Sequence, residues 1–195
     1  MISGSIRFWA AVSLAVGLMG LMAETARAAD PVAPAQLADG GYVLMLRHAL
    51  APGTGDPPDF ELGECSTQRN LNDEGRRQAR EIGAYLREAG VDEAQVFTSQ
   101  WCRCRETAEL LDLGPVEELP ALNSFYQRPE DREPNLEALR KFLAALPVDG
   151  PPVVLVTHQV TITAVTGNWV SSGGGYVLRL DGSEEPPVVG PLQEP

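Results

Sequence analysis

The chain has 195 residues, which is enough for one domain with a sizeable hydrophobic core. Its 27 acidic residues outnumber 15 lysines and arginines, so the formal net charge is −12 at pH 7. Binding to a nucleic-acid backbone depends on basic side chains that neutralise phosphates, so this composition argues against a nucleic-acid partner. Any arginines that converge in one cleft would form a local positive site in an acidic protein.

The N-terminus has the pattern of a secretory signal peptide over residues 1–28. Arg7 precedes an uncharged apolar stretch at residues 8–23, and residues 26–28 (Ala-Arg-Ala) supply the small side chains of a cleavage site. The apolar stretch is shorter than the ~20 residues that a spanning helix needs, so we expect no stable membrane anchor after cleavage. The protein is therefore expected to be exported, periplasmic or secreted.

After the signal peptide we predict a linker at residues 29–40, one folded domain at residues 41–180 and an acidic, proline-rich tail at residues 181–195. The tail has no apolar periodicity, so we expect it to be poorly ordered.

Within the domain, short apolar runs alternate with segments of helical spacing. Strands are predicted at residues 42–46, 95–98, 116–119, 153–156 and 176–180. Four helices are predicted. The first runs from Asn72, as N-cap, to Gly90, and the second follows Ser99. The third lies around residues 136–146, behind a charged loop at residues 128–134, and the fourth spans residues 159–166. This alternation predicts a single-domain α/β three-layer sandwich, with a mostly parallel central sheet and helices on both faces.

The chain has two histidines, His48 and His158, and each follows a predicted strand. Arg47 directly precedes His48. In open α/β sheets the carboxyl ends of the strands border the ligand crevice, so we expect both imidazoles in one site.

A third strand end precedes a helix with arginines in its first turns. Arg103 lies four residues after Ser99, and if Ser99 caps this helix, Arg103 lies about one turn in and reaches an anion at the cap. Arg105 would point about 200° away. We expect Arg105 on the surface, paired with Glu109.

These residue types suit phosphoryl transfer without a metal. Histidine is one of the few side chains that form a covalent intermediate which water then resolves. Phosphoryl transfer spreads charge over three oxygens, so catalysis depends on fixed positive groups. Arginine meets phosphate oxygens two at a time and stays protonated.

Four sequence pieces together resemble the histidine phosphatase superfamily, which has the phosphoglycerate mutase-like fold. They are Arg47-His48 after a strand, Arg69-x-Leu71-x3-Gly75 opening a helix, Thr98-Ser99-x3-Arg103-x3-Thr107-Ala108, and Thr157-His158. The resemblance implies that His48 is the nucleophile that becomes phosphorylated. It further implies that Arg47, Arg103 and His158 complete the catalytic phosphate pocket, with Arg69 as a supporting, substrate-binding residue. We assign Ser99 to substrate binding as well.

The sequence departs from the family at two places. Ala49 replaces the usual glycine after the nucleophile. No carboxylate stands where members carry the general acid, because these places read Leu122-Asn123-Ser124 and His158-Gln159. The proton donor is therefore unassigned. Candidates are first Glu130, Asp131 and Glu133 in the charged loop, then Asp56 and Asp59; a substrate with a good leaving group would need no acid.

The chain has three cysteines, and the compartment expected after export is oxidising. Cys102 and Cys104 are poor partners for each other, so we expect Cys65 to form a disulfide with one of them and leave one thiol free. Structural zinc requires four ligands, and the three cysteines provide too few. We expect neither a metal nor a cofactor.

The sequence thus predicts a metal-independent histidine acid-type phosphatase that hydrolyses a small phosphorylated substrate, a phosphomonoester such as an envelope or sugar phosphate, through a phosphohistidine on His48. A mutase is disfavoured because the segment between Leu122 and Leu136 is too short for a closing lid. The alternative is a protein that retains the phosphate pocket but turns over weakly or not at all.

Overall fold

The computed structural model describes residue 1 and residues 29–193. The predicted signal peptide lies almost wholly outside these residues. No helix among them is long and apolar enough to cross a membrane. The strands are β1 (Tyr42–Arg47), β2 (Gln95–Thr98), β3 (Val116–Glu118), β4 (Val153–Thr157), β5 (Gly175–Arg179) and β6 (Val188–Pro191). The α-helices are α1 (Ala35–Ala38), α2 (Asp73–Glu88), α3 (Cys102–Leu111), α4 (Arg132–Ala145) and α5 (Gln159–Thr166). Short 3-10 helices span Cys65–Thr67, Pro120–Leu122 and Pro129–Asp131.

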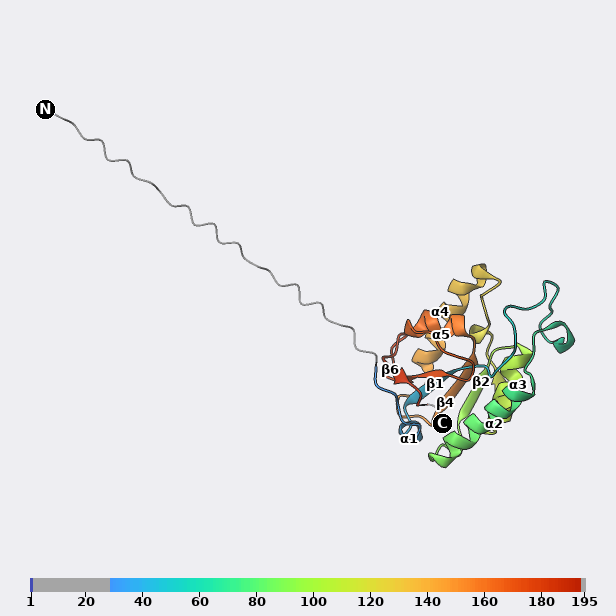
Figure 1. Cartoon of the computed structure of the whole chain (residues 1–195). Coiled ribbons are helices and arrows are strands. Elements are labelled where there is room, and N and C mark those ends of the chain that lie inside the picture. Colours follow the sequence, from blue (N-terminus) through green and yellow to red (C-terminus); the bar gives the residue numbers. More distant parts are fainter. Residues whose placement is uncertain (2–28, 194–195) are drawn as a thin grey trace.

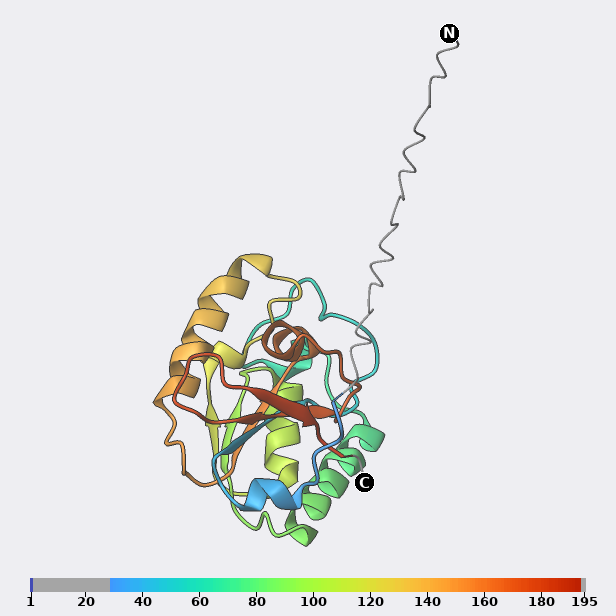
Figure 2. The same ribbon diagram turned by 90° about the vertical axis from the view of Figure 1, so that its left-hand side faces the viewer.

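The strands form one sheet in the order β3-β2-β4-β1-β5-β6. The first four run parallel to one another, and β5 pairs antiparallel with both β1 and β6. Figure 2 shows β5 and β6, in red, on the side of the sheet nearest the viewer. The predicted α/β fold with a mostly parallel sheet is confirmed.

Helices cover both faces of this sheet, as Figure 1 shows. In β1, Leu44 and Leu46 pack into the hydrophobic cluster that contains residues of α2 and α3. Val43 and Met45 pack into the cluster that contains residues of α4 and α5. A strand that is buried on both faces reads as a continuous apolar run, which explains the sequence of β1. The three-layer sandwich is therefore also confirmed.

The N-terminal and C-terminal segments of the folded domain extend beyond the predicted boundaries. The expected linker contains α1, and its Val32 and Leu37 are buried in the main core. The expected disordered tail contains β6, which pairs with β5, and Leu192 forms a bridge with Val32. Both segments carry apolar residues without local periodicity, and they become ordered because they pair with distant parts of the chain. The predictions of a linker and a poorly ordered tail are wrong for these residues.

The charged loop is likewise shorter than predicted. A 3-10 turn occupies Pro129–Asp131, and α4 already begins at Arg132. Pro134 lies in the first turn of α4, where its missing N–H removes no intrahelical hydrogen bond. The start of α2 is as predicted, because the side chain of Asn72 accepts a hydrogen bond from the Gly75 amide at 2.8 Å.

Candidate active site

The two histidines lie side by side where β1 and β4 end. Arg47, the last residue of β1, is in register with Thr157, the last residue of β4. The next residue on each strand is a histidine, and the ring centroids of His48 and His158 are 5.6 Å apart. The expectation that both imidazoles share one site is met because parallel neighbouring strands end at the same edge of the sheet.

The imidazole of His48 is held in one tautomer. Its Nδ1 lies 2.8 Å from the carbonyl oxygen of Ala49, which only accepts hydrogen bonds, so Nδ1 carries the proton. The lone pair of Nε2 is then free for attack on an electrophile. Burial, followed by the positive charge of Arg103, holds the pKa of His48 well below its usual range, so the ring is neutral at pH 7.

His158 is oriented by Ser99. The Ser99 hydroxyl donates to Asn123 Oδ1 at 3.2 Å and lies 2.8 Å from His158 Nε2, so it accepts the Nε2 proton. His158 Nδ1 then faces Arg103 Nη2 at 3.5 Å. Burial and the charge of Arg103 also hold the pKa of His158 well below its usual range. A bound phosphate dianion would reverse this effect and favour an imidazolium that donates from Nδ1.

Ser99 therefore has a different position from the one predicted. Helix α3 begins at Cys102 with Trp101 as its N-cap, and no side chain caps it. Ser99 is not among the residues that line the cavity next to His48. Its hydroxyl instead sets the orientation of His158.

Three arginines converge on the same cavity, from β1, from the segment before α2 and from α3. Arg47 donates from Nη1 to the Val170 carbonyl at 2.9 Å. Arg69 donates from Nε to the Gly55 carbonyl at 2.8 Å and from Nη1 to the Ala51 carbonyl. Burial and neighbouring Arg103 lower the pKa of Arg69 to about 10. These contacts fix the guanidinium groups close to one another, although their charges repel.

Two of the arginines have unused donors. Within the described part of the chain, Nε of Arg47 and Nε of Arg103 are buried without a hydrogen-bond partner. Buried N–H groups are rarely left unpaired, because each loses its hydration without compensation. An oxyanion in the cavity would supply the missing acceptors.

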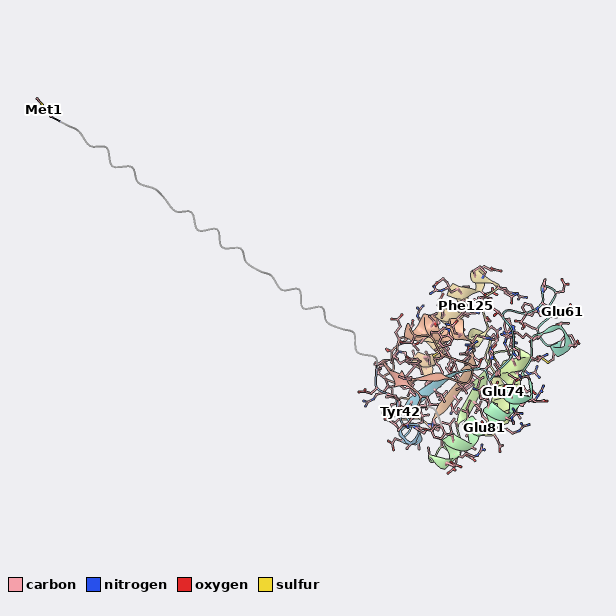
Figure 3. All side chains as sticks on the ribbon, viewed as in Figure 1. Met1, Tyr42, Glu61, Glu74, Glu81 and Phe125 are labelled. Carbon is pink, nitrogen blue, oxygen red and sulfur yellow. A yellow bond between two sulfur atoms is a disulfide. The ribbon has the colours of Figure 1, made fainter. Side chains whose placement is uncertain are left out.

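The cavity that these groups border has a volume of about 120 Å³. Its lining residues are Arg47, His48, Gly53, Thr54, Gly55, Asp56, Arg69, Arg103, Ser124, Tyr126, Gln127, His158, Gln159 and Val160. Two segments therefore frame it, the loop after β1 and the segment after β3. Glu61 and Phe125, labelled in Figure 3, belong to these two segments. The described residues contain no group of three or more His, Cys, Asp or Glu side chains that could hold a metal ion.

Asp56 is the carboxylate that the structure brings to the cavity. The other four candidate acids, Glu130, Asp131, Glu133 and Asp59, are absent from the lining residues that the structure describes. The loop that we consider first as the source of the proton donor, residues 128–134, thus contributes no carboxylate to the described cavity lining. Of the stretch Leu122-Asn123-Ser124, where the family resemblance places a glutamate, Ser124 does line the cavity.

Two structural features position the arginine-bearing segments. A disulfide joins Cys65 to Cys102, so the predicted Cys65 bridge is confirmed, and Cys104 is the buried free cysteine. This bridge connects the segment that leads to Arg69 with the first residue of α3. In α2, a Cβ at Gly75 would lie 2.1 Å from the Leu50 carbonyl oxygen, so only glycine allows the helix to approach the loop after His48 this closely.

Arg105 lies away from this site, as predicted, but its partner differs. Its Nε is 3.5 Å from Glu118, at the end of β3, and both side chains are substantially exposed. Glu109, the expected partner, lies on the same helix, whereas the neighbouring strand end offers the closer carboxylate.

The fold and the site together define an α/β protein with a small cavity, in which a neutral imidazole lies beside three arginines. Residues 44–126 match the family model described as histidine phosphatase superfamily (branch 1). The matched segment includes Arg47, His48, Arg69 and Arg103. No curated protein matches the chain in sequence.

Several solved structures share this fold. SixA from Agrobacterium tumefaciens superimposes with a TM-score of 0.52 at 20% identity, over 80% of this chain and 99% of its own. The protein histidine phosphatase SixA complexed with tungstate gives a TM-score of 0.56 at 20% identity, over 78% and 96%. A mycobacterial glucosyl-3-phosphoglycerate phosphatase complexed with VO3 gives 0.51 at 17% identity, over 71% and 92%. At these identities the structural matches establish the fold. With the family model, they confirm the resemblance to the histidine phosphatase superfamily.

Proposed function

We propose that this protein is a metal-independent phosphatase of phosphomonoesters that acts through a phosphohistidine on His48. The observation that carries the proposal is the pairing of a free Nε2 on His48 with the unpartnered Nε donors of Arg47 and Arg103 on one cavity. A nucleophile and donors for the transferred oxygens are the two components that this chemistry requires.

In the proposed reaction, the Nε2 lone pair of His48 attacks phosphorus, the bond from phosphorus to the leaving oxygen breaks, and that oxygen takes a proton from water. The Nδ1 proton stays on the ring, where the Ala49 carbonyl accepts its hydrogen bond and stabilises the charge that the ring acquires. Water then attacks phosphorus and the P–N bond breaks. This step releases inorganic phosphate and restores the neutral imidazole, and the arginines neutralise the phosphoryl oxygens throughout.

The names of the structural relatives support the class of reaction but not one substrate. One relative is named a protein histidine phosphatase and another a glucosyl-3-phosphoglycerate phosphatase, and both were solved with an oxyanion, tungstate or VO3. Their shared feature is phosphoryl transfer, which supports the same chemistry in this chain.

The remaining lining residues of the cavity suggest the rest of the substrate. Besides the arginines, the histidines and Asp56, they include the neutral hydrogen-bonding side chains of Thr54, Ser124, Tyr126 and Gln159. A second anionic group on the substrate would find no unpaired cation among these side chains. A neutral, hydroxyl-rich group would find both donors and acceptors there. We therefore propose a sugar phosphate. With the export that the N-terminal sequence predicts, a phosphorylated envelope sugar is the natural source.

One observation favours a second candidate function, a phosphate-ligand-binding protein with weak turnover. Of the segment Leu122-Asn123-Ser124, where the family resemblance would place the proton-donating glutamate, it is Ser124 that lines the cavity. A serine hydroxyl is a poor proton donor, so a substrate with an alkoxide leaving group would react slowly unless another group or water supplied the proton.

Phosphate release from a panel of sugar phosphates, with p-nitrophenyl phosphate alongside, separates the two functions. The phosphatase predicts catalytic turnover of at least one sugar phosphate, unaffected by a chelator and abolished in His48→Ala. Turnover of p-nitrophenyl phosphate alone, with tight binding of sugar phosphates, would instead establish the binding protein. Absence of both turnover and phosphate binding would reject both functions.

A further inference from the structure

Asp56 has an unusual environment for a carboxylate in a phosphate pocket. Its side chain is 3% exposed, and its Oδ1 accepts hydrogen bonds from Arg103 Nη1 at 2.8 Å and from the Arg69 amide at 3.0 Å. Its Oδ2 accepts from Trp101 Nε1 at 3.0 Å. Each of these donors lacks a lone pair, so both oxygens serve as acceptors and a proton on either one would displace a hydrogen bond. This arrangement suits a carboxylate that holds its donors in place rather than a proton donor.

The contact with Arg103 leaves a specific edge of the guanidinium free. Asp56 and the Arg69 carbonyl both bind Nη1. Nε, buried, has no partner among the described residues, and the contact of Nη2 with His158 is long at 3.5 Å. Nε and Nη2 form the side edge of the guanidinium, whose two parallel N–H groups match two oxygens of a phosphate. By holding Nη1, Asp56 therefore orients the Nε–Nη2 edge of Arg103 toward the cavity.

Asp56 also sets the charge of the pocket. The three arginines that line the cavity carry three positive charges, and Asp56 leaves a net of two. A phosphate monoester at neutral pH carries between about −1.5 and −2. The pocket with Asp56 thus matches the charge of its ligand, and Asp56 offsets part of the repulsion among the arginines in the empty site.

The backbone of Asp56 is fixed as firmly as its side chain. Its N–H donates to Gln127 Oε1 at 2.6 Å, and Gln127 Nε2 donates to its carbonyl oxygen at 3.1 Å. Gln127 belongs to the segment after β3, which also lines the cavity. The two hydrogen bonds hold the loop after His48 in the position from which the carboxylate reaches Arg103.

From these contacts we infer that Asp56 is a positioning residue of the phosphate pocket, which acts through Arg103 by presenting its Nε–Nη2 edge to the transferred phosphoryl group. This inference deepens the proposed function and rests on it. It assigns no proton transfer to Asp56, although Asp56 is the candidate acid that lines the cavity.

The test is a double-mutant cycle of Asp56→Ala and Arg103→Ala, measured as kcat/KM. In the wild-type background, Asp56→Ala should lower kcat/KM on the order of 10- to 100-fold, because misplacing a group in the site by about 1 Å costs as much. In the Arg103→Ala background, Asp56→Ala should cost nothing or restore activity, since the carboxylate then lacks its cation. Equal fold losses in both backgrounds would overturn the inference.

A second measurement separates positioning from proton donation and from general damage to the loop. A positioning residue gives the same fold loss on p-nitrophenyl phosphate and on an alkyl phosphate, whereas a proton donor gives a much larger loss on the alkyl phosphate. Asp56→Asn, which keeps the size but not the charge, should retain more activity than Asp56→Ala. Asp59→Ala, at an exposed position of the same loop, is the matched control and should leave kcat/KM unchanged. A loss confined to alkyl phosphates would overturn the inference.

The same cycle measured on the Kd of inorganic phosphate requires no turnover. If the wild-type protein binds phosphate without hydrolysing any ester, and Asp56→Ala weakens binding only when Arg103 is present, the proposed function fails and the role of Asp56 stands. If the enzyme turns over but the two substitutions act independently in both measurements, the function stands and this inference fails.

Discussion

The Nδ1 atom of His48 lies 2.8 Å from the carbonyl oxygen of Ala49, and this contact leaves Nε2 as the ring nitrogen available for attack in the proposed reaction. We expect phosphate on Nε2 of His48 after brief incubation with substrate. His48→Ala should show neither the acid-labile adduct nor turnover. Mass spectrometry of rapidly quenched protein locates the residue, and the nitrogen is assigned by NMR of the phosphorylated protein. Phosphate on another residue, or on Nδ1 of His48, would contradict the mechanism.

Arg103 and Arg105 lie on the same helix and offer a matched pair of variants. Arg103→Ala should lower kcat/KM on the order of 10²- to 10³-fold, as expected for loss of one transition-state donor. Arg103→Lys should recover only part, because a point charge cannot replace the side edge of a guanidinium. Arg105→Ala, which removes only an exposed contact with Glu118, should change kcat/KM little. Similar losses for the two alanine variants would show that Arg103 has no special role.

The two buried histidines should make the stability of the empty protein fall in mild acid. Their folded pKa values lie well below 6.5, whereas an unfolded histidine has a pKa of about 6.5. Between these values the unfolded chain binds more protons, so the free energy of unfolding decreases as pH falls through this window. Denaturant unfolding from pH 7 downward should show a smaller decrease for His158→Asn than for wild type. Inorganic phosphate favours protonated imidazoles, so it should also reduce this acid-induced decrease in the free energy of unfolding. Identical pH dependence in the two proteins would exclude this linkage.

The lowered pKa of His48 also predicts how the activity depends on pH. The acid limb of kcat/KM reports the free enzyme, so we expect it to lie below pH 6.5 once the titration of the substrate phosphate, with its second pKa near 6, is taken into account. An acid limb above pH 6.5 would show that His48 is protonated in the free enzyme.

The cysteines should give different thiol counts in the native and unfolded protein. Burial raises the pKa of Cys104 to about 12, so the native protein should react with almost no thiol reagent. Denatured, unreduced protein should show one reactive thiol, and reduction should reveal all three. Replacing Cys65 and Cys102 by serine should lower the free energy of unfolding by ~2–4 kcal/mol, with Cys104→Ser as the single-site comparison. Three thiols without reduction would contradict the Cys65–Cys102 bridge.

Removing residues 187–195 should destabilise the domain measurably. The truncation deletes β6, exposes the hydrogen-bonding edge of β5 and removes Leu192 from the main core. We expect a lower midpoint of thermal unfolding and a greater tendency to aggregate. A truncation of only the last two residues is the comparison. Unchanged stability after removal of residues 187–195 would mean that β6 contributes little to the fold.

Much of the site could be predicted from sequence because its central residues follow recognisable strands. The apolar runs that end at Arg47 and Thr157 identify two buried strands, and parallel strands place their ends at one edge of the sheet. The sequence alone therefore predicts that Arg47, His48 and His158 lie together. The four-residue spacing from Ser99 predicts Arg103 as a fourth group there, although the cap on which that argument depends is not formed, because Trp101 is the N-cap of α3.

Only the tertiary structure decides the role of Asp56, whether the two terminal segments are folded into the domain, and which cysteine pairs with Cys65. Asp56 contacts Arg103 across 47 residues, and Val32 meets Leu192 at the far end of the chain. Local patterns of apolar and polar residues report which face of an element is buried, but they carry no information on which distant side chain lies opposite. That choice depends on how loops close and how strands pair, so a loop carboxylate without periodicity showed its arginine partner only once the chain had folded.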